Sequence, residues 1–132
     1  MNLFEKFQLE IKEDVKIDQI NLLERQLMLP ALKHKWVARL IENKRLKNQL
    51  EKKKKDLKEE VLKTLQKDGL PTGIPKAALQ AKVDSSDVIY NINQDIENTE
   101  LIIEYLEKVE KIFSSMTFDI KNITEISKLE MT

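Results

Sequence analysis

The sequence predicts an all-α fold of long helices with a coiled-coil-like C-terminal half. Of the 132 residues only two are Gly and three are Pro. Sheet folds of this size need turn residues with positive φ about every eight to twelve residues, and two glycines cannot supply them. Apolar residues instead recur at spacings of three and four along most of the chain, which is the period of one helix face. The length allows a single domain.

The composition also limits the chemistry and the cellular context. The chain has no Cys, which excludes disulfides, thiolate metal sites and a cysteine nucleophile and fits a reducing compartment. Near the N-terminus Glu5 and Lys6 are charged, and no apolar run approaches the roughly 20 residues of a membrane span. We therefore expect a soluble cytoplasmic protein without a membrane partner.

The N-terminal residues predict two helices. Asn2 is expected to cap a first helix that ends near Asp14, and Asp18 a second one over residues 19–29, because short polar side chains accept hydrogen bonds from free N–H groups. Pro30 then either kinks a continuous helix or begins a new one at the tolerated first position. The apolar face of the first helix comprises Leu3, Phe4, Phe7 and Ile11.

A long helix is predicted over residues 31–67. Asp68 and Gly69 are expected to stop it, since Gly readily adopts the left-handed conformation of a C-cap. Residues 70–75 contain two Pro and one Gly and predict a loop, followed by a short turn of helix over residues 76–82. The apolar stripe of the long helix comprises Leu32, Trp36, Leu40, Leu46, Leu50, Leu57, Val61 and Leu65.

The last long helix is predicted to start at one of four polar residues, Asp84, Ser85, Ser86 or Asp87. Its inner residues recur at an average spacing of about 3.5, which indicates a coiled-coil seam. Residues 114–117 are expected to break it, with a terminal helix starting near Phe118. The seam comprises Ile89, Ile92, Ile96, Thr99, Ile103 and Leu106.

These elements predict one helical domain over residues 1–132. Residues 1–69 form the N-terminal helices, residues 70–83 the connecting loop, and residues 84–132 the acidic C-terminal helices. Because so small a chain cannot cover both long apolar stripes internally, we expect the C-terminal part to mediate assembly into a helical homo-oligomer. The expected subunit contacts are Ile103, Leu106, Phe113, Met116, Ile120, Ile123 and Ile126.

The net charge of zero hides a division along the chain. Residues 33–63 contain twelve basic and five acidic residues, a net charge of +7, whereas residues 84–113 contain eight acidic and two basic residues, a net charge of −6. Such a basic strip suits a phosphate backbone. The plainer alternative is a solvated face that pairs with its own glutamates or with the acidic helix. The candidate DNA contacts are Lys44, Arg45, Lys47, Lys52, Lys53, Lys54, Lys55, Lys58 and Lys63.

Catalytic residues are not evident. The single histidine, His34, has no partner at the spacing of a metal-binding helix, so a solvated or capping role is expected. Glu59 and Glu60 are adjacent and point about 100° apart on a helix, which does not suit a shared acid/base site. No Gly-rich phosphate loop is present. We expect no enzymatic activity, no metal and no cofactor, and Trp36 is expected in the core rather than as a platform for stacking bases.

Three stretches, in this order, resemble the UvsY family of recombination mediators from T-even-type bacteriophages and their relatives. The first is residues 12–18 (Lys-Glu-Asp-Val-Lys-Ile-Asp) followed by Asn21 and Leu22. The second is residues 29–36 (Leu-Pro-Ala-Leu-Lys-His-Lys-Trp), and the third is residues 118–123 (Phe-Asp-Ile-Lys-Asn-Ile). The resemblance spans nearly the whole chain.

The resemblance implies a non-enzymatic protein of homologous recombination and repair. Members of the family bind single-stranded DNA, form rings of about six or seven subunits, and help a phage recombinase displace the phage single-strand-binding protein. The implied location is the host cytoplasm. The alternative from another class is a helical scaffold or assembly adaptor that binds only proteins.

One departure from the family affects the expected site. Family members carry two basic residues separated by one position, then a hydrophobic residue and a tyrosine pair, toward the end of the long helix. The corresponding stretch here is residues 59–62, Glu-Glu-Val-Leu, and the tyrosines are absent. The DNA-contact role is therefore not transferred to Glu59 and Glu60. The nearest basic candidates are Lys52, Lys53, Lys54, Lys55, Lys58 and Lys63.

Overall fold

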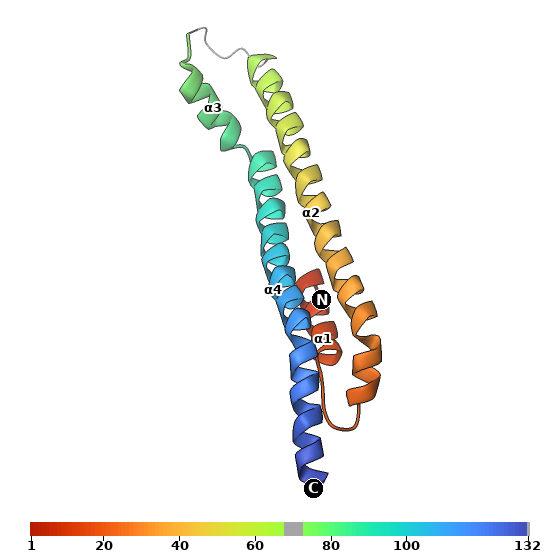
Figure 1. Cartoon of the computed structure of the whole chain (residues 1–132). Coiled ribbons are helices and arrows are strands. Elements are labelled where there is room, and N and C mark those ends of the chain that lie inside the picture. The colour runs from red at the N-terminus through yellow and green to blue at the C-terminus, as the bar shows by residue number, and fades with distance from the viewer. Residues whose placement is uncertain (68–72, 132) are drawn as a thin grey trace. The chain divides into compact units, whose positions relative to one another are not determined.

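A computed structural model of the chain describes residues 1–67 and 73–131 (Figure 1). The described residues form four helices: α1 (Leu3–Asp14), α2 (Leu22–Lys67), α3 (Lys76–Asp84) and α4 (Asp87–Met131). This confirms the predicted all-α class. The expected helix stop at Asp68 and Gly69, together with the first residues of the predicted loop, lies outside the described residues.

Two of the predicted helix starts are confirmed in detail. The Asn2 side chain accepts a hydrogen bond of 2.8 Å from the Glu5 backbone N–H and caps α1. Ser86 plays the same part for α4, because its Oγ accepts from the Ile89 N–H at 3.4 Å. Both oxygens satisfy N–H groups that lack a partner within the first turn.

The predicted start of the second helix is wrong by three residues. Asp18 Oδ1 does accept hydrogen bonds of 2.8 Å from the N–H groups of Ile20 and Asn21, but these residues form a turn. The Asn21 Oδ1 in turn accepts a hydrogen bond of 2.8 Å from the Asp18 N–H. The reciprocal bonds fix an Asx-type turn, so α2 begins only at Leu22. It then continues through Pro30, so no new helix begins at the proline.

The predicted break at residues 114–117 is also wrong, since α4 is continuous from Asp87 to Met131. No Gly or Pro occurs in this range. The Ser115 hydroxyl donates to the Ile112 carbonyl at 2.8 Å within the helix, a local bond that serine makes without ending a helix. Phe113 and Met116 are buried on either side, which holds this turn in place.

The described residues divide into two compact units. Unit 1 consists of Met1–Glu42 and Ile102–Thr132, and unit 2 consists of Asn43–Leu101. Each unit therefore takes residues from both α2 and α4.

Unit 1 contains the larger core. Its centre is aromatic: the rings of Trp36 and Phe113 stack with centroids 6.4 Å apart, and Phe7 meets Trp36 edge to face at 5.5 Å. Trp36 and Phe113 are each 1% exposed, which confirms Trp36 as a core residue. The buried cluster comprises Phe7, Ile11, Leu29, Leu32, Trp36, Leu40, Ile103, Leu106, Val109, Phe113, Met116 and Ile120.

Unit 2 is a hairpin in which a small apolar cluster joins α2 to α4. Its buried apolar side chains are Ile89, Ile92 and Ile96, with the half-buried Leu50 and Leu57 packed against them. All six predicted seam residues of α4 are buried. So small a cluster supplies little hydrophobic stabilisation, so polar contacts carry more weight in this unit.

Candidate nucleic-acid interface

The basic residues of α2 divide into two groups within unit 2. Leu50 and Leu57 face the acidic helix α4, and a helix turns by about 100° per residue. The exposure of each side chain divides the basic residues more directly than its angle does, because Lys53 lies near this face and is nevertheless exposed. Of the nine predicted contacts, Lys47, Lys54 and Lys58 are half-buried, whereas Lys44, Arg45, Lys52, Lys53, Lys55 and Lys63 are exposed.

Two of the three half-buried lysines form ion pairs with carboxylates. Lys47 Nζ lies 3.3 Å from Glu100 of α4, and Lys58 Nζ lies 3.0 Å from Asp84 at the end of α3. The Lys58 hydrogen bond is the main cause that lowers the pKa of Asp84 below its usual 3.8, and the Gln80 hydrogen bond and the Lys54 charge add to it. The alternative expected from the sequence, pairing between the basic and acidic helices, is thus confirmed for Lys47, whereas the partner of Lys58 lies in α3.

The exposed residues include a continuous row, the outer basic strip, defined as Arg45, Lys52, Lys55 and Lys63. Steps of seven and eleven residues separate Arg45, Lys52 and Lys63, and each step ends within about 20° of a whole number of turns. Lys55, three residues after Lys52, lies about 60° to one side of this line. The strip rises about 27 Å along α2, and its four side chains are exposed. It can present a row of positive charges to a phosphate backbone.

An acidic residue interrupts the outer basic strip. Glu59 lies seven residues after Lys52 and is exposed, so it falls on the same side of the helix. Glu60 is also exposed but points about 100° away. The two glutamates that mark the departure from the family pattern are therefore not equivalent: one lies within the strip and the other beside it.

Two basic residues of α2 in unit 1, Lys35 and Arg39, hold the fold together. Lys35 pairs with Asp14, and Arg39 Nη1 lies 2.6 Å from Glu10 Oε2, so both bind α2 to α1. The Arg39 guanidinium also lies over the rings of Phe7 and Trp36, at 5.1 and 4.7 Å from their centroids. The Arg39 hydrogen bond is the largest cause that lowers the pKa of Glu10 below 4.5. Lys35 and Arg39 therefore make contacts that stabilise the fold.

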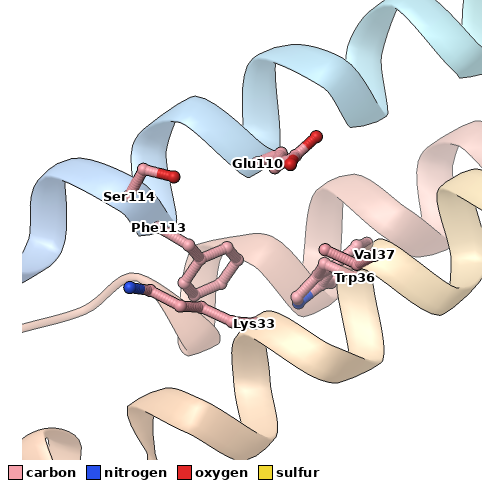
Figure 2. Close-up of a pocket in the computed structure, with 6 residues that line it drawn as sticks. All are labelled: Lys33, Trp36, Val37, Glu110, Phe113 and Ser114. Atoms are coloured by element: carbon pink, nitrogen blue, oxygen red, sulfur yellow. The ribbon is translucent and has the colours of Figure 1, made fainter.

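A small pocket of about 100 Å³ lies between α2 and α4 in unit 1 (Figure 2). Its floor is formed by Trp36 and Phe113, whose faces are too buried to stack on a base. Figure 2 shows the Lys33 ammonium and the Glu110 carboxylate at its rim, pointing away from each other. Nothing in this arrangement resembles a general acid/base pair.

Neither a metal site nor a membrane-spanning helix is found among the described residues. Within residues 1–67 and 73–131, no three or more His, Asp or Glu side chains gather as a metal site. Over the same residues, no helix has the length and apolar character needed to cross a bilayer. His34 is exposed.

The predicted subunit contacts also divide into two groups. Ile103, Leu106, Phe113, Met116 and Ile120 lie in the core of unit 1, because α1 covers an apolar stripe that the sequence alone left open. Ile123 is half-buried and Ile126 is 53% exposed. Phe118 and Leu129, which are not among the expected contacts, are 69% and 75% exposed. A role of the seven residues in assembly stays a prediction, and only the exposed ones could meet a partner without rearrangement.

The fold is similar to that of known proteins. Crystal structures of the bacteriophage T4 recombination mediator protein UvsY match it with TM-scores of 0.82 and 0.79, at 20% and 19% sequence identity. The first match covers 98% of this chain and 99% of the T4 chain, and the second covers 100% and 99%. At this identity the likeness shows the fold. No curated protein matches the sequence significantly.

The family assignment rests on the sequence itself. The model of the family described as "Recombination, repair and ssDNA binding protein UvsY" matches residues 10–132. This range includes all four helices except the first seven residues of α1. The protein therefore belongs to the UvsY family.

Proposed function

We propose that this protein binds single-stranded DNA through the outer basic strip and acts as a recombination mediator. The observation that carries the proposal is the exposed row of Arg45, Lys52, Lys55 and Lys63 on α2 in a chain of the UvsY family. Positive side chains that neutralise phosphates release counterions from DNA, and this release supplies affinity without sequence preference.

One strip of four cations, with Glu59 inside it, is a modest site. A homo-oligomer that repeats the strip would hold one strand through several weak contacts, and the effective concentration of the second contact raises the overall affinity. We propose a ring of subunits for this purpose. The exposed apolar residues at the end of α4, among them Ile126 and Leu129, are suited to subunit contacts because exposed apolar clusters mark interfaces.

The proposed task is to help a phage recombinase to load onto DNA coated with the phage single-strand-binding protein. A mediator must interact differently with the two competing nucleoprotein states, because a ligand with equal preference shifts no equilibrium. A ring that holds the strand in a bent path along several copies of the strip would disfavour the bound single-strand-binding protein. Separate surfaces would then recruit the recombinase.

The DNA-binding part is tested by titrating a fluorescently labelled oligonucleotide at several salt concentrations. Replacing Arg45, Lys52, Lys55 and Lys63 with Ala should weaken binding and reduce the slope of log K against log salt by up to about 0.7 for each lost contact. The matched control removes four exposed lysines elsewhere, Lys6, Lys12, Lys16 and Lys121. Equal effects in both variants, or none in either, would contradict the assignment of the strip.

A second candidate function is a protein-only helical scaffold. The ion pairs Lys47–Glu100 and Lys58–Asp84 favour it, since they use the basic helix for internal contacts. A scaffold would show no DNA binding at low salt, where phosphate contacts are strongest. The same titration therefore separates the two candidates.

A further inference from the structure

A second pair of lysines runs beside the exposed basic residues of α2. The first pair, Lys44 and Lys55, is separated by eleven residues. The second pair, Lys47 and Lys58, has the same separation, and each of its members lies three residues after a member of the first pair. Eleven residues are close to three full turns, so the second pair forms a line parallel to the first along the same helix. We call Lys47 and Lys58 the inner row.

The inner row is accessible but occupied. Both side chains remain 33% exposed, and each ammonium group lies against one carboxylate of unit 2, Glu100 for Lys47 and Asp84 for Lys58. These carboxylates are themselves 45% and 50% exposed. Ion pairs with this exposure add little to stability and are weakened by salt, so another anion can replace the carboxylate.

A DNA phosphate is such an anion. Carboxylate and phosphate oxygens both accept charge-assisted hydrogen bonds from a lysine ammonium group. The helix geometry places the inner row next to Lys44 and Lys55, which lie on the side where the outer basic strip would hold a strand. The carboxylates of Glu100 and Asp84 thus stand where phosphates of the bound strand could lie.

We propose that Asp84 and Glu100 act as internal competitors of DNA, which occupy the inner row in the free protein and limit the affinity of each subunit for single-stranded DNA. This inference rests on the proposed function and adds a regulation to it. The end of α3 that carries Asp84 can move away from Lys58, because α3 is only nine residues long and Val83 is its one buried residue among those described. Displacing Asp84 from Lys58 requires no change in the core of Ile89, Ile92 and Ile96.

The test compares two variants that remove the same number of charges. Asp84→Asn together with Glu100→Gln frees the inner row, whereas Asp87→Asn together with Glu97→Gln removes two exposed carboxylates of α4 that have no ion pair among the described residues. The first variant should bind a labelled single-stranded oligonucleotide about two- to fivefold more tightly for each freed lysine. Its salt slope should steepen by about 0.7 for each new phosphate contact. The second variant should show at most a smaller change without a steeper slope.

A double-mutant cycle locates the effect. Adding Lys47→Ala and Lys58→Ala to the Asp84/Glu100 variant should abolish the gain, while the two alanines alone should change wild-type affinity little. If the double variant loses its helical circular dichroism signal, the single variant Asp84→Asn is used in its place. Equal gains in the two charge-matched variants, or no gain from freeing the inner row, would overturn the competitor role and leave DNA binding by the outer basic strip intact. Absence of wild-type binding at low salt would overturn both.

Discussion

The indole Nε1 of Trp36 donates a hydrogen bond of 2.9 Å to Asp14, the last residue of α1. Lys35 pairs with the same carboxylate oxygen. Asp14 thus joins the end of α1 to the most buried aromatic side chain of α2, and it satisfies a polar group that would otherwise lie buried without a partner.

Asp14→Ala is expected to lower the free energy of unfolding by about 1–3 kcal/mol, because it leaves the buried Trp36 N–H without an acceptor. Urea denaturation followed by tryptophan fluorescence measures this. The adjacent Glu13→Ala is the control, since Glu13 is exposed and should change the midpoint little. Similar midpoints for the two variants would contradict the role of Asp14.

The contact between Arg39 and Glu10 predicts a response to acid. The pKa of Glu10 in the folded protein lies below 4.5, so folding favours the ionised carboxylate. Its contribution to stability is fully present above the unfolded pKa and is lost as the pH falls through the folded pKa. Glu10→Gln should therefore lose less stability than wild type below about pH 4.5, by an amount kept small by the exposure of the carboxylate. Parallel curves of urea midpoint against pH would refute this.

Much of the fold could be predicted from periodicity. The seam from Ile89 to Leu106 and the stripe around Trp36 are buried as expected, because helical spacing alone selects these faces. The break at Ser114 could not be judged correctly, since serine is compatible with a turn or with a helix interior and the neighbouring buried residues decide. The start at Leu22 depends on reciprocal bonds between Asp18 and Asn21 that no spacing reveals.

The candidate site could be predicted less fully. Charge counting finds all the lysines of residues 33–63, but it cannot tell Lys58, which meets Asp84, from Lys52, which faces solvent. That division depends on which side of α2 packs against α4. Likewise, Leu106 and Phe113 are buried because α1 packs against them. The sequence does not reveal this packing and instead predicts both residues at a subunit contact.

Glu59 and Glu60 offer a test of the strip at the resolution of one residue. Glu59→Gln should raise affinity for single-stranded DNA about two- to fivefold, because it removes a repulsive charge from the row of cations. Glu60→Gln removes the same charge from the neighbouring face and should have a smaller effect. The ratio of the two affinities in one titration series is the readout. A larger gain from Glu60 would place the strand on a different side of α2.

Assembly is tested at the surface rather than in the core. Ile126→Ser together with Leu129→Ser should reduce the mass measured by light scattering, because both side chains are exposed in the single chain and can pack against another subunit. Leu9→Ser on α1, which is also exposed, serves as the control. Deletions after Ser114 would remove Met116 and Ile120 from the core and would not isolate the interface. An unchanged oligomer mass for the double variant would exclude this end of α4.

The central claim is mediation. The most direct measurement follows the ATPase activity of the phage recombinase on single-stranded DNA pre-coated with single-strand-binding protein while this protein is added. We expect stimulation that passes through an optimum near a stoichiometric ratio and that is lost when Arg45, Lys52, Lys55 and Lys63 are replaced with Ala. Inhibition at every ratio, with DNA binding intact, would contradict the account, because it would show competition for phosphates without any preference for the recombinase filament.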